Sequence, residues 1–224
     1  MRSSPRELTS TFVVIFTTLL EEVSLMKIGL LGCLALTVSS AFGSTLSMNT
    51  TVDNGFSIYI STSSSVLGTL VGTGNDWQTT YSYSTPLTPG VTNYLQVVAN
   101  NITGPGAFLG DFSLDDTNFH FVNNTQTLLT NNVDWFFSTT AIGGPYTVAN
   151  DQGANGVGPW GTRPGIDSNA HWIGDPGNCT NCTVYFETAI TPNAATPEPT
   201  TPLLIAGGVA LLLGIRRKKR SNVV

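Results

Sequence analysis

Two cysteines and two histidines are the side chains best suited to metal or redox chemistry. Cys179 and Cys182 are spaced as Cys-Thr-Asn-Cys, a spacing found in redox motifs and in one half of a zinc site. A structural zinc site needs four ligands, and the sequence does not show that His120 and His171 join this pair, so no metal is assigned. The redox interpretation places such a pair at the start of a helix, whereas here a strand-like run follows it. In an exported chain, which the two ends indicate, the pair is expected to form a local disulfide.

Several aspartates could support acid–base chemistry or bind calcium. Asp111, or the adjacent Asp115 and Asp116, could provide the paired carboxylates of a glycoside hydrolase, but such a pair is defined by its separation in space. The same residues, with Asp53 and Asn54, offer oxygen ligands to calcium, although exposed turns in an acidic domain explain them more simply. The chain has no Gly-x-Ser-x-Gly elbow to place a serine nucleophile. No catalytic residue and no cofactor are therefore assigned, and calcium is kept as the alternative.

The tryptophans could contact a sugar. Trp160 lies in a Gly-rich stretch, and Trp172 follows His171. An exposed indole beside polar donors matches the apolar face of a sugar ring. Trp135 and Trp172 lie in apolar strand-like runs, which favours their burial, whereas burial and exposure are both open for Trp160. The candidate glycan contacts are Trp160, Trp172 and His171.

Alternating side chains predict an all-β domain around these residues. Phe56, Ile58 and Ile60 alternate with more polar residues, as in a half-buried strand. Strands are predicted at residues 56–60, 94–99, 108–114, 118–122, 134–139 and 183–190. Gly-, Pro- and Asn-rich turn signals separate them, and residues 149–169 are predicted to form an extended loop. Short strands at this spacing favour a single β-sandwich.

The charge distribution excludes one class of partner. Between Ser44 and Thr196 a single arginine stands against ten acidic residues, a net charge of about −9. Binding to nucleic acid requires Lys and Arg to replace the counterions of the phosphates. Nucleic acid is therefore not expected as a partner.

Residues 1–43 have the pattern of a signal region. Met26 and Lys27 open a stretch with one positive charge, an apolar run and small residues up to Gly43, after which cleavage is expected. The true start codon could be that of Met26, or the preceding segment could extend the signal. Cys33 resembles the cysteine of a lipoprotein cleavage box, but the apolar run continues well past it.

The C-terminus has three parts. A Pro-rich linker at 193–202 follows the ectodomain at 44–192, then an apolar stretch at 203–215, then a basic tail at 216–224. As a helix the apolar stretch spans only about 20 Å, short of a hydrocarbon core of roughly 30 Å. It is interpreted as a short transmembrane helix. The cations that stop transfer and remain cytoplasmic are Arg216, Arg217, Lys218, Lys219 and Arg220.

This tail resembles the PEP-CTERM sorting tail of Gram-negative bacteria that make extracellular polysaccharide. The resemblance rests on Pro197-Glu198-Pro199, the short apolar helix and the Arg-rich end, in that order. It implies export through the secretion translocon, transient anchoring in the inner membrane, and recognition by the membrane protease-transpeptidase exosortase, which is thought to cut near the Pro-Glu-Pro motif. The implied destination is the cell surface or the extracellular matrix, in association with exopolysaccharide and biofilm.

Within the domain, residues 170–173 (Ala-His-Trp-Ile) and 184–188 (Val-Tyr-Phe-Glu-Thr) are loosely similar to strands of galactose-binding-like jelly rolls. That similarity implies a jelly-roll-like sandwich and transfers no ligand-binding residue. Three functions follow in order of preference. The first is a non-catalytic structural or adhesive surface protein, the second a carbohydrate-binding module, and the third a glycan hydrolase that uses Asp115 or Asp116.

Overall fold

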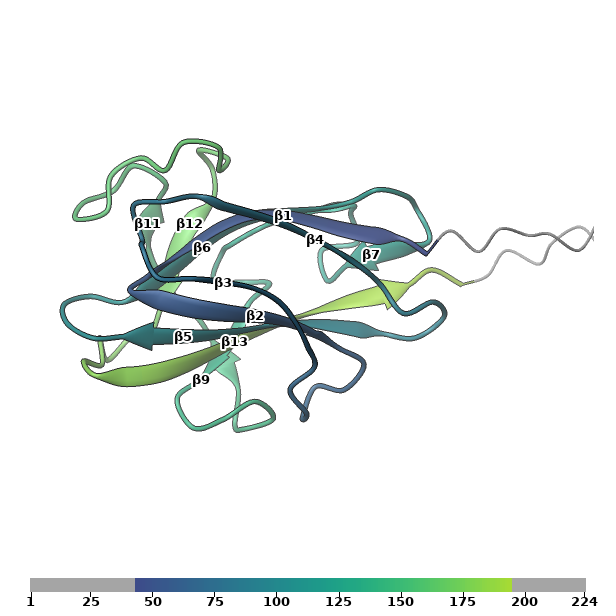
Figure 1. The fold of residues 1–224 in the computed structure, drawn as a ribbon, viewed down its shortest axis with the longest axis horizontal. Coiled ribbons are helices and arrows are strands. Elements are labelled where there is room, and N and C mark those ends of the chain that lie inside the picture. The colour runs from purple at the N-terminus through teal and green to yellow at the C-terminus, as the bar shows by residue number, and fades with distance from the viewer. Residues whose placement is uncertain (1–42, 195–224) are drawn as a thin grey trace, which may run out of the picture. The chain divides into compact units, whose positions relative to one another are not determined.

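A computed structural model describes residues 43–194. These residues form an all-β fold of two antiparallel sheets that face each other as a β-sandwich, which confirms the predicted fold class (Figure 1). Sheet A has the strand order β11-β12-β6-β1-β4, with β8 also paired to β6. Sheet B has the order β10-β9-β13-β5-β2-β3, with β7 also paired to β13.

The strands alternate between the two sheets along much of the chain. Sheet A contains β1 (Thr45–Asp53), β4 (Tyr81–Pro86), β6 (Ala107–Leu114), β8 (Thr127–Leu129), β11 (Asn150–Ala154) and β12 (His171–Gly174). Sheet B contains β2 (Gly55–Ser61), β3 (Thr69–Gly74), β5 (Asn93–Asn101), β7 (Phe119–Phe121), β9 (Phe136–Ser138), β10 (Thr147–Val148) and β13 (Cys182–Pro192).

The main core fills the space between the sheets. Because successive side chains of a strand point to opposite faces, alternate residues of each strand enter this core. Phe108 from sheet A meets Phe186 from sheet B at a ring-centroid distance of 5.3 Å, and the edge of one ring meets the face of the other between Phe108 and Trp135, at 5.0 Å. Trp135 is fully buried, as its apolar run predicted.

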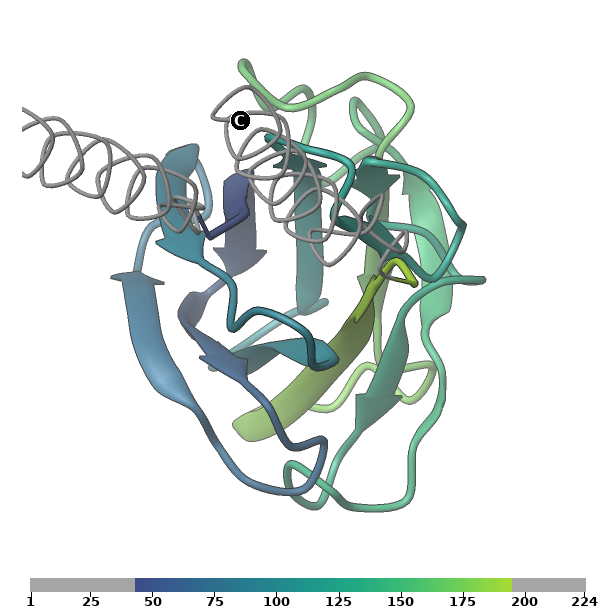
Figure 2. The ribbon, with the colours of Figure 1, turned by 90° about the vertical axis from the view of Figure 1, so that its right-hand side faces the viewer.

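The first and last described residues, 43 and 194, lie at the same end of the sandwich (Figure 1). The loop at residues 115–118, between β6 and β7, binds the residues next to both. The Ser44 hydroxyl donates to the Asp116 carboxylate at 2.8 Å, and the Asn193 backbone N–H donates to the Asn118 carbonyl at 2.8 Å. Figure 2 views the sandwich from this end. We call this loop the terminal clamp.

The predicted strands all fall on observed ones, but the predicted loop is partly wrong. Asn150–Ala154 forms β11, which pairs with β12 at the edge of sheet A. The sequence did not predict β11, because its residues are polar and an edge strand exposed to solvent needs no apolar alternation. The register also shifts between Asp151 and Ala154, around Gly153 with φ of +111°, which interrupts any regular pattern.

Candidate functional site

A polar groove lies on the outer face of sheet A. In β1, Leu46 and Met48 enter the core, so Ser47 and Asn49 point outward. Strand register then places two rows of polar side chains side by side across β4, β1 and β6. The first row is Ser84, Ser47 and Ser113, and the second is Ser82, Asn49 and Asp111. The groove that these rows line has a volume of about 320 Å³.

Hydrogen bonds hold the second row in place. The Ser82 hydroxyl donates to Asn49 Oδ1 at 2.7 Å, and Asn49 Nδ2 donates to Asp111 Oδ1 at 2.9 Å. The other Asp111 oxygen accepts the backbone N–H of Asp167 at 2.8 Å. These hydrogen bonds hold the Asp111 carboxylate and the Asn49 amide in one orientation. A ligand that binds two groups fixed in this way loses less conformational entropy of the protein.

The first row has free hydroxyls. Ser47, Ser84 and Ser113 are exposed, and their hydroxyl groups have no hydrogen-bond partner within residues 43–194. A hydroxyl both donates and accepts, so a row of three suits a ligand that is itself rich in hydroxyl groups. The groove therefore presents three serine hydroxyls, one carboxylate and one amide, and these groups are suited to binding a polar ligand.

The long loop at residues 155–170 packs on the outer face of sheet A and meets the groove at Asp167, whose N–H binds Asp111. Apolar residues of this loop, of β6 and of β12 form a second buried group that we call the outer cluster. The members of the outer cluster are Ala107, Leu109, Trp160, Ile166, Ala170 and Trp172. The loop is tied down by Asn155, whose Nδ2 donates to the carbonyls of Arg163 and Ile166 at 3.1 and 3.0 Å.

The two candidate glycan-contacting tryptophans are part of this cluster and are not exposed. Trp160 is 2% exposed and Trp172 is 0% exposed, and their rings stack at a centroid distance of 4.8 Å. Trp160 Nε1 donates to Asp53 Oδ2 at 3.0 Å. Neither ring presents a free face, so the prediction that they stack on a sugar is corrected. The Gly-rich loop buries Trp160 because the outer face of β6 is apolar at Ala107 and Leu109 and needs a cover.

His171, the third candidate, lies apart from the groove in a surface pair with Asp151. Nδ1 of His171 and a carboxylate oxygen of Asp151 are 2.8 Å apart, and both side chains are about one-third exposed, at 38% and 34%. Partial burial acts to raise the pKa of Asp151, but the bonds from His171 and from the Gly153 N–H outweigh it and lower that pKa. Within the described part of the chain, this histidine bonds no serine hydroxyl, so the pair lacks the nucleophile of a triad.

Two of the three candidate hydrolytic carboxylates, Asp115 and Asp116, belong to the terminal clamp, whereas Asp111 lies in the groove. Asp115 Oδ1 accepts the backbone N–H of Thr45 at 2.7 Å, and this bond lowers the pKa of Asp115. Asp116 accepts the Ser44 hydroxyl and the Asn118 N–H, each at 2.8 Å. These contacts give both residues a structural role at the ends of the sandwich.

The outer face of sheet B carries a different buried polar group. Glu187 is 7% exposed and accepts the Gln96 amide at 3.0 Å. Burial raises the pKa of Glu187, while its contacts with Gln96 and Tyr146 act to lower it. Gln96 also donates to the Ser63 carbonyl at 3.1 Å and accepts the Gly68 N–H at 3.2 Å. The pair thus fastens the loop between β2 and β3 onto the sheet.

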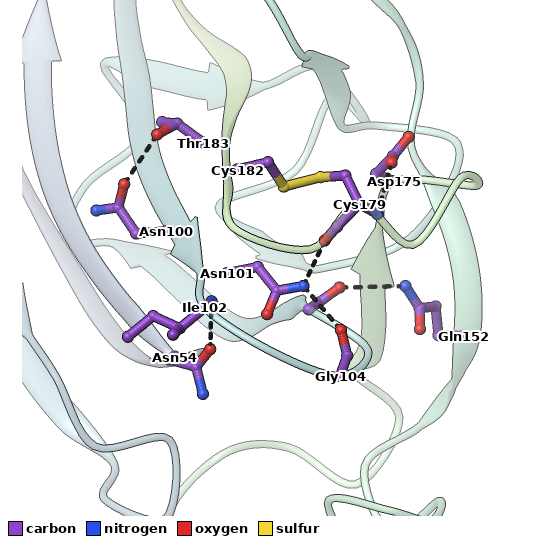
Figure 3. The surroundings of a disulfide bond; sticks show 11 residues. Asn54, Asn100, Asn101, Ile102, Gly104, Gln152, Asp175, Cys179, Cys182 and Thr183 are labelled. Carbon is purple, nitrogen blue, oxygen red and sulfur yellow. Dashed lines mark hydrogen bonds between the residues drawn. A yellow bond between two sulfur atoms is a disulfide. The ribbon is translucent and has the colours of Figure 1, made fainter.

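The predicted disulfide between Cys179 and Cys182 is present. It closes the turn that leads into β13 (Figure 3). Because β13 ends beside the terminal clamp, this turn lies at the opposite end of the sandwich (Figure 1). The Cys179 carbonyl accepts Asn101 Nδ2 at 2.6 Å, so the turn is also attached to the end of β5.

Asp111 was predicted from the sequence as a candidate carboxylate, but Asn49 and the serines of the groove were missed. The signal was available in Ser47-Met48-Asn49 and in Tyr81-Ser82-Tyr83-Ser84, where polar residues alternate with apolar or aromatic ones. Either segment alone predicts only a strand with one solvent-exposed polar face. The pairing of β1 with β4 and β6 places these polar faces side by side.

The sorting residues Pro197, Glu198 and Pro199 and the basic cluster at 216–220 lie outside the described residues. Within residues 43–194, no three His, Cys, Asp or Glu side chains gather as metal ligands. That same range contains no helix that is long and apolar enough to cross a membrane. Comparison of the chain with protein families, with curated proteins and with solved structures finds no match.

Proposed function

We propose that this chain is an exported cell-surface or extracellular-matrix protein, sorted by its PEP-CTERM tail, with a non-catalytic structural or adhesive role at exopolysaccharide. The observation that supports this proposal is the terminal clamp. The last described residues leave the sandwich beside the first, and both are bound to residues 115–118. A domain that is attached at this end leaves the outer faces of both sheets, and the opposite end of the sandwich, accessible to other molecules.

The partners of this proposal are the translocon, the inner membrane and exosortase. The sequence motif, Pro197-Glu198-Pro199, is four residues beyond Asn193, the last residue bound by the clamp. A protease at the membrane would therefore act on a segment that follows β13 in the sequence. Cleavage there removes no residue of the sandwich.

Intact mass and membrane partitioning of the protein from its own cells test the sorting proposal. We expect a mature C-terminus near residues 197–199 and a protein that is released or attached to surface glycan. The matched control replaces Pro197, Glu198 and Pro199 by alanine, which should leave the full tail in the inner membrane. A wild-type protein that keeps its tail in the inner membrane contradicts exosortase sorting and leaves a plain single-span anchor.

A second function, carbohydrate binding, is favoured by the groove on sheet A. Its volume of about 320 Å³ is at the lower end of the range for small-molecule sites, roughly 300 to 1,000 Å³. Its free serine hydroxyls and its fixed Asp111 and Asn49 match a polyol. The net charge of about −9 would repel an acidic polymer, so a neutral glycan is the proposed ligand. The jelly-roll-like topology, with strands alternating between the sheets, remains part of this proposal.

Retention of the full chain on immobilised neutral exopolysaccharide tests the groove. The Ser47→Ile variant fills the centre of the groove with a side chain that suits a strand, so the fold should be kept. We expect a loss of affinity of about tenfold or more, which corresponds to about 1.4 kcal/mol. Thr69→Ile, at an exposed hydroxyl on β3 of the other sheet, is the control. Equal retention of the two variants would exclude the groove as the binding site.

A further inference from the structure

The first row of hydroxyls continues beyond the groove onto β8. Ser113 of β6 is paired with Thr127 of β8, just as Phe112 is paired with Leu128. Leu128 is buried in the main core, so Thr127 points outward, on the same face as Ser113. Thr127 is exposed, and its hydroxyl has no hydrogen-bond partner among residues 43–194. We call the four residues of the extended row the hydroxyl line: Ser84, Ser47, Ser113 and Thr127.

The hydroxyl line crosses four adjacent strands, in the order β4, β1, β6 and β8. Neighbouring strands lie about 4.7 to 4.9 Å apart, so the line is about 14 to 15 Å long. One sugar residue of an extended polysaccharide is about as long as the distance between two strands. The line therefore has the length of a short stretch of such a chain.

Both ends of the hydroxyl line reach solvent. Ser84 lies on β4, at one edge of sheet A, and Thr127 lies on β8, on the other side of β6. Both side chains are exposed. A chain that lies along the line can continue past the sheet at each end. The surface can therefore hold the middle of a polymer and does not require a terminal residue.

The loop at residues 155–170 closes the groove in the direction along the strands. It is fastened to β6, where the Asp167 N–H donates to Asp111, and beside the start of β4, where the Thr80 hydroxyl donates to the Pro164 carbonyl at 2.7 Å. Because β1 lies between β6 and β4, the segment between these two attachments passes over β1. A long ligand that ran along the strands would meet this segment, whereas the hydroxyl line leads across them.

We propose that the groove and its extension to Thr127 bind an internal stretch of a linear neutral polysaccharide that lies across the strands, with Ser84 and Thr127 as its outer contacts. A hydroxyl both donates and accepts, so each strand offers one contact to a chain that carries hydroxyls along its length. This inference rests on the carbohydrate-binding function proposed above. It adds that the ligand is an extended chain of about four or more sugar residues and not a terminal sugar.

Titration calorimetry of the purified full chain with oligosaccharides of graded length tests this inference. The oligosaccharides come from partial acid hydrolysis of the neutral exopolysaccharide. We expect each further sugar residue to tighten binding by about twofold to tenfold, up to about four residues, after which the affinity should level off. The number of protein molecules bound per polysaccharide chain should rise with the length of the chain.

Two variants remove the outer contacts. Thr127→Val removes the hydroxyl and keeps a β-branched side chain, so β8 should keep its fold. Ser84→Ala removes the hydroxyl at the other end. Each should weaken binding of chains of four or more residues by about twofold to tenfold, and should leave binding of the disaccharide unchanged, because a disaccharide can bind at the two central strands. Thr69→Val, at an exposed hydroxyl of sheet B, is the matched control and should bind every length as the wild type does.

A length-dependent loss in both end variants supports the inference. If Ser47→Ile loses binding while Thr127→Val and Ser84→Ala bind long chains as the wild type does, the groove binds carbohydrate but the chain does not lie across the strands. The inference is then overturned and the proposed carbohydrate binding stands. A wild type that binds the disaccharide as tightly as the polymer also overturns it. If Ser47→Ile binds the polymer as the wild type does, the inference and the binding function of the groove fail together.

Discussion

Replacing Trp160 tests whether the long loop is part of the folded body or a mobile arm that offers its indole to a sugar. The ring is 2% exposed, stacks on Trp172 at 4.8 Å and donates one hydrogen bond to Asp53. Truncation of a buried Phe or Trp to Ala costs about 3 to 5 kcal/mol. For a domain of this size, each kcal/mol lowers the melting temperature by roughly 2 to 4 °C. Trp160→Ala should therefore melt about 6 to 20 °C below the wild type.

Trp160→Phe separates the ring from its hydrogen bond. Phenylalanine keeps much of the contact with Trp172 but leaves Asp53 without its donor, and an unpaired buried acceptor costs about 1 to 3 kcal/mol. The variant should lie between Trp160→Ala and the wild type. Val133→Ala, at a side chain that is 71% exposed, is the control and should change stability by less than about 0.5 kcal/mol.

Urea denaturation and differential scanning calorimetry of the full chain measure these differences, and hydrogen exchange of residues 155–170 reports on the loop itself. If Trp160→Ala is as stable as the wild type and exchange in the loop is unchanged, the ring does not contribute to the fold. The burial argument would then fail, and Trp160 would again be a candidate for stacking on a glycan.

Two further predictions concern sheet B and its turns. Burial raises the pKa of Glu187 from 4.5, so the stability that it contributes is full below its unfolded pKa and is lost as pH rises through the folded value. Glu187→Gln should therefore gain stability relative to the wild type between about pH 4 and pH 7, measured as the difference in urea midpoints; a constant difference would contradict it. A Cβ at Gly68 would collide with the carbonyl of Ile60, whereas one at Gly158 meets no atom within 4 Å. Gly68→Ala should cost about 1 to 3 kcal/mol and Gly158→Ala less than about 0.5 kcal/mol by urea denaturation, and equal costs would contradict the steric argument.

Alternation in the sequence predicted the strands that border the core on one face only. The pattern of Phe56, Ile58 and Ile60 identified β2, and similar runs identified β5 and β13. It missed β1, because this strand buries Thr50 and Thr51, whose hydroxyls are satisfied by backbone carbonyls at 2.9 Å. Buried threonines break the contrast between apolar and polar positions on which the prediction depends.

The burial of Trp160 could also have been inferred. In the first half of β6, Phe108 faces the core while Ala107 and Leu109 face outward, so both faces are apolar there. A strand of this kind needs a cover on its outer side. The sequence does not say which segment provides the cover, because that depends on where the loop at residues 155–170 folds back. The polar groove has the same limit, since its rows come from β1, β4 and β6, and β6 is distant in sequence from the other two.

The terminal clamp has a mechanical consequence. Because β1 begins and β13 ends at the same end of the sandwich, a force that pulls residues 43 and 194 apart acts across the strands and not along them. The bonds of Ser44 and Asn193 to the clamp would break first, and the ladder bonds of β13 would then open one after another, each bearing the whole load in turn. Such a domain is weak as a link under tension between its two ends and strong as a body attached through one of them.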